Sequence, residues 1–73
     1  QDANVEEMMI KIIKEKDGVM ELSLLSQELK RQFPDFSVKN YGFSQFKKFV
    51  KSFSSLKLET DKTNNKNYVR LKK

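Results

Sequence analysis

Residues 33–53 read FPDFSVKNYGFSQFKKFVKSF and contain the strongest structural signal in the chain. In the second half of this stretch, apolar residues recur at i, i+3, i+4 and i+7, which places them on one face of an α-helix. These residues are Phe46, Phe49, Val50 and Phe53. Three lysines fall on the opposite face, namely Lys47, Lys48 and Lys51. The pattern predicts a helix with an aromatic inner face and a cationic outer face.

The first half of this stretch is a connection rich in turn residues. Pro34 ends the helix before it, because the residue that precedes a proline is pushed out of the helical region. Ser37 is placed to cap a single helical turn over 38–41, and Gly42 ends that turn. Ser44 is placed to cap the helix that follows. Aromatic rings are unusually frequent for a connection, which indicates that it folds back against the core.

Two further helices are predicted upstream. Residues 4–16 form the first, with Asn4 at its cap, and the Asp17-Gly18 pair ends it because glycine readily adopts the left-handed conformation. Residues 23–33 form the second, with Ser23 at its cap. Apolar positions follow helical spacing in both: Val5, Met8, Met9, Ile12 and Ile13 in the first, and Leu25, Leu29 and Phe33 in the second.

The end of the chain changes from helical to strand periodicity. Apolar and polar residues alternate over 56–59 and again over 68–71, and the polar segment 61–66 separates the two runs. This pattern predicts a β-hairpin with one buried face. The short run 19–22 adds one more strand, which pairs with the hairpin. The resulting order is that of a winged helix-turn-helix, an α+β fold with a three-helix core and a small antiparallel sheet.

The absence of Cys and His from all 73 residues excludes several kinds of site. Cys/His zinc sites, thiol nucleophiles, imidazole bases and disulfides are all ruled out. No set of acid, base and nucleophile emerges from the remaining residues, so we expect no enzyme, no cofactor and no metal site. No apolar run reaches the roughly 18 residues of a membrane span. We therefore expect a monomeric, cytoplasmic module without a membrane partner. The first residue is Gln1, so we expect residues 1–73 to be a single domain cut from a longer protein.

The formal charge of +5 is unevenly distributed along the chain. Residues 1–36 carry five bases and eight acids, a net charge of −3, whereas residues 37–73 carry ten bases and two acids, a net charge of +8. Such asymmetry suggests a face that meets an anion, with nucleic acid as the first candidate. An ordinary solvated surface is the alternative.

Four motifs, in order, resemble those of the OST-HTH domain, also called LOTUS. They are Asp17-Gly18-Val19-Met20, Leu22-Ser23-x-Leu25-x3-Leu29, Phe33-Pro34-x-Phe36 and Tyr41-Gly42-Phe43-Ser44-x-Phe46-x2-Phe49-Val50. The closing Tyr68-Val69-Arg70-Leu71 is similar to the last strand of the family. The resemblance covers about residues 5–72.

The resemblance implies a winged helix that binds RNA and catalyses nothing. Minimal members of the family bind RNA and prefer G-rich and G-quadruplex forms. In bacterial and plant relatives, an NYN-type ribonuclease domain often lies in the same chain. Extended members carry an additional C-terminal helix and bind a DEAD-box helicase. A helix of that kind would need residues beyond Lys73.

We therefore expect RNA to bind along the third helix and the hairpin, or wing. The candidate contact residues are Lys39, Tyr41, Lys47, Lys48, Lys51, Lys57, Tyr68 and Arg70. The lysines and the arginine would contact phosphates. Tyr68 lies on the outer face of the wing and would stack on a base, whereas packing against the core is the favoured role of Phe36 and Tyr41. With so few arginines, we expect recognition of backbone and shape rather than of base edges.

Two other functions fit the same fold. A protein-interaction adaptor would present an exposed apolar patch, and Ile10 and Leu24 are its first candidates because both fall outside the apolar stripes of their helices. A duplex-DNA reader would insert the third helix into the major groove, and duplex DNA would then compete as well as RNA does.

Overall fold

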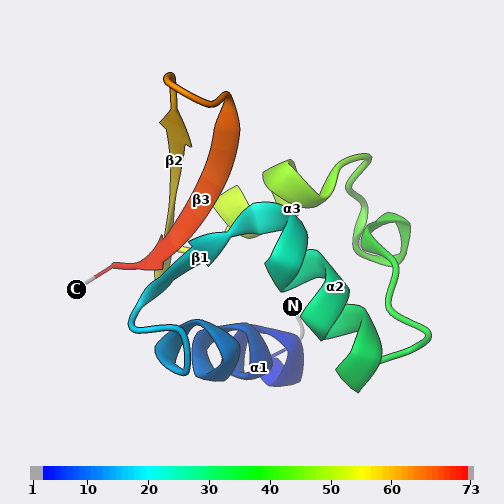
Figure 1. Cartoon of the computed structure of the whole chain (residues 1–73). Coiled ribbons are helices and arrows are strands. Elements are labelled where there is room, and N and C mark those ends of the chain that lie inside the picture. Colours follow the sequence, from blue (N-terminus) through cyan, green and yellow to red (C-terminus); the bar gives the residue numbers. More distant parts are fainter. Residues whose placement is uncertain (1–2, 73) are drawn as a thin grey trace.

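The computed structural model describes residues 3–72 and has the predicted order of helices and strands (Figure 1). The elements are α1 (Ala3–Lys14), β1 (Val19–Glu21), α2 (Leu22–Gln32), the 3₁₀-helix η1 (Val38–Tyr41), α3 (Phe46–Lys51), β2 (Leu56–Asp61) and β3 (Lys66–Leu71). Three α-helices and a three-stranded antiparallel sheet among the described residues form the α+β arrangement of a winged helix. The predicted fold class is confirmed.

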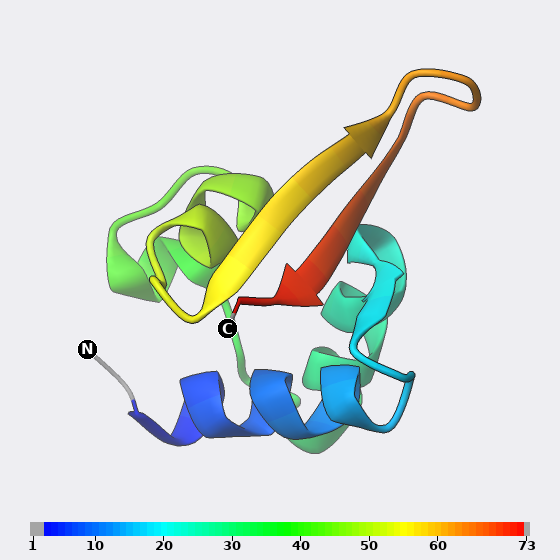
Figure 2. The ribbon, with the colours of Figure 1, turned by 90° about the vertical axis from the view of Figure 1, so that its left-hand side faces the viewer.

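β3 is the central strand of the sheet, whose order is β1-β3-β2. Met20 of β1 and Leu58 of β2 both lie opposite Val69, which is fully buried. The buried side of the sheet therefore faces the helices, and the neighbouring positions Tyr68 and Arg70 lie on its outer side. Figure 2 shows the turn of the hairpin extending beyond the helices, as a wing does.

The core is built from the apolar stripes that the sequence predicts. Its buried residues are Val5, Met9, Ile12, Ile13, Met20, Leu25, Leu29, Phe49, Val50, Phe53, Leu56 and Val69. Phe49 is 2% exposed, and its ring packs against several others from the connection and from α3. The rings of Phe36 and Tyr41 lie 5.4 and 5.2 Å from it between centroids. The connection therefore folds back onto the core, as its aromatic content predicts.

The predicted helix caps are wrong at three positions. α1 begins at Ala3, so Asn4 lies within its first turn, and α2 begins at Leu22, directly after β1, so Ser23 lies inside it. The pairing of β1 with β3 ends at Glu21, opposite Tyr68, and the helix begins at the next residue, earlier than a cap at Ser23 would place it. α3 begins two residues after Ser44, and its N-cap is Gln45.

Both predicted glycines adopt a positive φ, although α1 ends at Lys14 instead of residue 16 and Asp17, with φ +62°, is left-handed as well. Gly18 has φ +90° after α1, and its N–H donates to the carbonyl of Ile13 at 2.9 Å. Gly42 has φ +84° at the end of η1, and its N–H donates to the carbonyl of Lys39 at 3.1 Å. Ser37 occupies the N-cap position of η1 but makes no side-chain capping bond. The turn before α3 therefore depends on backbone geometry.

We expect Gly42→Ala to lower the free energy of unfolding by about 1–2 kcal/mol, because an L-residue at positive φ brings its Cβ close to the backbone. Beyond its own residue and the two neighbouring residues, a Cβ at this position would meet no atom within 4 Å, so the loss is conformational and involves no packing clash with the rest of the fold. Chemical denaturation measures it, and Gly42→Asn should lose less because asparagine tolerates this conformation. Equal losses for both variants would contradict this reason.

Candidate nucleic-acid interface

α3 presents three lysines to solvent while its opposite face is buried. Phe49 and Val50 lie in the core, whereas Lys47, Lys48 and Lys51 are exposed. Among residues 3–72, no carboxylate oxygen lies within 4 Å of these three ammonium groups. The six residues of α3 thus carry three cations without an acidic partner among residues 3–72. No other group of the predicted site residues concentrates as much positive charge. We call Lys47, Lys48 and Lys51 the α3 lysine face.

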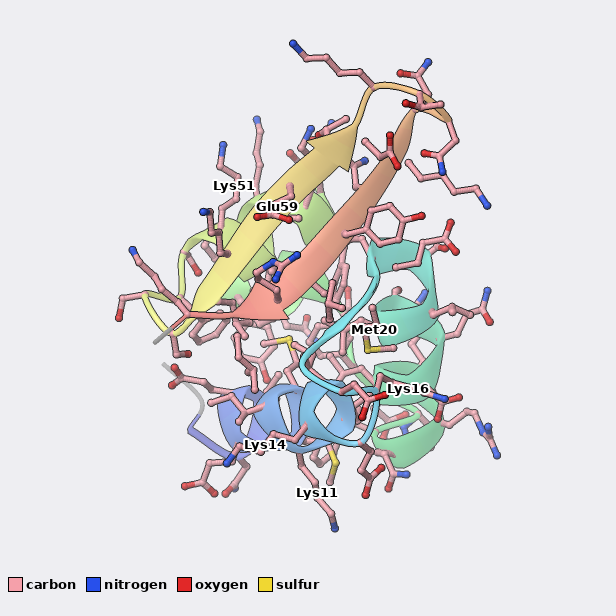
Figure 3. All side chains as sticks on the ribbon, turned by 60° about the vertical axis from the view of Figure 1, so that its left-hand side comes forward. Lys11, Lys14, Lys16, Met20, Lys51 and Glu59 are labelled. Carbon is pink, nitrogen blue, oxygen red and sulfur yellow. The ribbon has the colours of Figure 1, made fainter. Side chains whose placement is uncertain are left out.

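The two predicted cationic contact residues of the wing, Lys57 and Arg70, share an acidic partner instead. Lys57 Nζ lies 3.7 Å from Glu59 Oε2, and Arg70 Nε lies 3.1 Å from Glu59 Oε1. Figure 3 shows Glu59 on the side of the sheet turned away from α3, with Lys51 beyond the edge of the sheet. Two cations therefore share one carboxylate on the outer side of the wing, and the charge available there is smaller than the residue count suggests. Exposed pairs of this kind are weak, roughly 0–1 kcal/mol, so a phosphate can compete for either cation.

The two predicted tyrosines differ in their surroundings. Tyr41 is partly buried, and its ring lies 5.2 Å from that of Phe49 and 5.8 Å from that of Phe36. This packing explains why a tyrosine stands at the start of the Tyr41-Gly42-Phe43-Ser44 motif. Tyr68 is partly buried on the outer side of the wing, where Asn64 Nδ2 donates to its hydroxyl oxygen at 3.5 Å. Its contact with a base stays a prediction.

Two neighbouring grooves lie beside α2, and neither was predicted from the sequence. One, of about 290 Å³, is lined by α2, the connection and the start of α3, and it includes the predicted contact residue Lys39. The other, of about 340 Å³, runs between the start of α2 and the hairpin turn. Ser26 and Phe46 line both grooves. The i, i+4 spacing of Ser26 and Lys30 was the one sequence signal for this surface, since it places both on the same face of α2.

Similarity to known proteins agrees with this geometry. The family model described as the OST-HTH/LOTUS domain matches residues 3–68. The chain belongs to this family. No curated protein and no solved structure matches the chain significantly.

LOTUS domains are binding domains, and the family acts in RNA binding or in protein interaction. The structure of this LOTUS domain has neither a candidate metal site nor a membrane-spanning helix among its described residues. No group of three or more acidic residues is placed to hold a metal ion in that part of the chain. No helix there is long and apolar enough to cross a membrane.

The apolar patch expected of a protein adaptor is only partly present in this LOTUS domain. Leu24 on α2 is 44% exposed and is the one large hydrophobic residue that is exposed among residues 3–72. Ile10 is partly buried and packs against the core, so it contributes little to such a surface. A single exposed leucine is common on protein surfaces.

Proposed function

We propose that this LOTUS domain binds RNA, with a preference for G-rich and G-quadruplex forms, through the α3 lysine face and Lys39 of η1. The observation that carries the proposal is the set of three exposed lysines on α3 without a carboxylate partner among the described residues. Each ammonium group that neutralises a phosphate releases condensed counterions, and this release favours binding.

The two arginines favour recognition of shape over recognition of sequence. Arg31 Nη1 lies 3.2 Å from Glu28 Oε2, and Arg70 Nε lies 3.1 Å from Glu59 Oε1. Both guanidinium groups therefore already have a carboxylate partner. A guanidinium group reads a guanine edge by bonding two base atoms at once, and an ion pair with a carboxylate competes with that contact. Lysines act instead as point charges on phosphates. A folded quadruplex suits them because it offers closely spaced phosphates and needs no base-edge contact.

The wing has a secondary part in this proposal. Lys57 and Arg70 are both paired with Glu59. They extend the cationic surface only when a phosphate binds them in place of Glu59 or alongside it. Tyr68 lies on the same outer side and would stack on an exposed base or tetrad. In a longer protein, the domain would deliver RNA to chemistry supplied elsewhere, such as an NYN-type ribonuclease domain in the same chain, and we place this activity in the cytoplasm.

The proposal is tested by fluorescence anisotropy with four labelled ligands: a G-quadruplex RNA, a single-stranded RNA of equal length, a duplex RNA and a duplex DNA. We expect the quadruplex to bind most tightly. With about four phosphate contacts and a slope of roughly −0.7 to −0.9 per contact, its affinity should fall about 50-fold to 150-fold between 50 and 200 mM salt. The same G-rich oligonucleotide in lithium chloride, which does not support the quadruplex, is the matched control.

Two results would contradict the proposal. Equal affinity for duplex DNA and quadruplex RNA would assign the domain to duplex reading by α3. Absence of binding to all four ligands would leave the protein-adaptor role, with Leu24 as the residue to test.

A further inference from the structure

The two grooves beside α2 are neighbours that share part of their lining. Ser26 of α2 and Phe46 at the start of α3 line both of them. Their combined lining extends from the hairpin turn, along α2, to the connection that returns from α2 to α3. We call the two together the α2 groove.

One end of the α2 groove combines cations, hydroxyl groups and aromatic rings. Lys30 and Lys39 are exposed at this end, and no carboxylate oxygen within the described chain lies within 4 Å of either ammonium group. The rings of Phe36 and Phe46 form part of the wall, with their centroids 6.2 Å apart and their planes at 90°. Ser26 and Ser37 add hydroxyl groups that can donate or accept hydrogen bonds.

The other end is polar and close to neutral. Its lining includes Ser23 and the hairpin residues Asn65, Lys66 and Asn67. Lys66 Nζ lies 3.7 Å from Glu21 Oε2, which also lines this end. Amide and hydroxyl groups can bond the edges of an unpaired base or a ribose, while the net positive charge of the groove is concentrated at Lys30 and Lys39.

We infer that the α2 groove binds an unpaired, single-stranded segment of the RNA whose folded part lies on the α3 lysine face. A cationic track lined by rings is the arrangement that holds single strands, because an unpaired base exposes the flat face that stacks on an aromatic side chain. A paired base keeps that face inside the duplex. The inference rests on the proposed function and specifies which part of the RNA this second surface takes.

The position of the groove supports a shared ligand. Phe46 lines the groove, and the α3 lysine face lies on the other side of the same six-residue helix. Lys39 lines the groove and also belongs to the proposed RNA surface. A strand that leaves a folded RNA on α3 passes from the lysine side of this short helix to its Phe46 side, where Lys30 and Lys39 are available to its phosphates.

The test compares one quadruplex RNA with and without a tail of five unpaired uridines. The natural chain should bind the tailed form about tenfold more tightly, which corresponds to about 1.4 kcal/mol and lies within the range for one stacked base. Three variants should remove this gain and leave the affinity for the tail-less quadruplex unchanged: Ser26→Gln, Phe46→Leu and Lys30→Gln. Lys14→Gln on α1 changes the same charge outside the groove and should keep the gain.

Ser26→Gln makes the test independent of folding. Ser26 is partly exposed on α2 and lines both parts of the groove, so a longer side chain there occupies groove volume without entering the core. Phe46→Leu keeps an apolar side chain against Phe49 but removes the stacking ring. Thermal unfolding of each variant identifies any loss of fold, and Ser26→Gln decides the matter even where Phe46→Leu is unstable.

The outcomes separate this inference from the proposed function. In one outcome, binding of the tail-less quadruplex depends on the α3 lysine face, but the extra affinity from the tail survives Ser26→Gln. This result would contradict binding of the tail in the α2 groove and would leave the proposed function standing. No binding of either RNA would overturn both. An equal gain from a tail of abasic nucleotides would overturn stacking on Phe46. Displacement of the tail by a polyglutamate peptide without loss of the quadruplex would assign the groove to an acidic protein segment instead.

Discussion

Phe49→Ala is expected to lower the free energy of unfolding by about 3–5 kcal/mol, the usual cost of emptying a large aromatic site in a core. Phe49 is 2% exposed. Its ring lies between 5.1 and 6.2 Å, centroid to centroid, from the rings of Phe36, Tyr41, Phe43, Phe46 and Phe53. At roughly 0.05–0.15 kcal/mol per residue, the whole domain has about 4–11 kcal/mol of stability, so this single variant should lose between about a quarter and all of it.

Urea denaturation followed by circular dichroism measures this loss, and Phe43→Ala is the matched control. Phe43 is partly buried, and within residues 3–72 its ring contacts that of Phe49 alone. Its removal should cost about 1–2 kcal/mol. A smaller loss for Phe49→Ala than for Phe43→Ala would show that the connection is held in place by other contacts.

The faces of the helices could be predicted from the sequence because they follow from local spacing. The i, i+3, i+4, i+7 pattern places Phe49 and Val50 inside and Lys47 outside, whatever the rest of the chain does. The starts of the helices could not be predicted in this way. α2 begins at Leu22, directly after Glu21, which is paired with Tyr68, a contact that joins residues 47 positions apart in the sequence.

The same distinction applies to the candidate site. Strand alternation places Lys57, Glu59 and Arg70 on one side of the sheet, but their ion pairs depend on the register between β2 and β3. That register is fixed by the length of the hairpin turn. The polar segment between the two strands does not show at which residue the turn begins or ends, so its length is uncertain by several residues when only the sequence is read. The α2 groove is less predictable still, because it forms where α2, the connection and the hairpin turn meet.

Replacing the whole α3 lysine face is expected to have the largest effect on binding. The Lys47/Lys48/Lys51→Gln variant should lose about ten- to a hundredfold in affinity for quadruplex RNA at 100 mM salt. It should also lower the magnitude of the salt slope by about 2–3, because each lysine that contacts a phosphate contributes roughly one unit. Stability should change little, since all three side chains are exposed and lack a carboxylate partner among residues 3–72.

The matched control removes the same charge from another part of the molecule. Lys11, Lys14 and Lys16 are exposed on α1 and the turn that follows it, and Figure 3 shows them at the opposite end of the molecule from Lys51. Their replacement by Gln should change affinity about twofold, because charges farther than a Debye length of about 10 Å are largely screened at 0.1 M salt. Equal losses for the two triple variants would attribute binding to net charge alone. An unchanged affinity and an unchanged salt slope in the α3 variant would remove the lysine face from the interface. A loss confined to the α3 variant would locate the bound phosphates on α3.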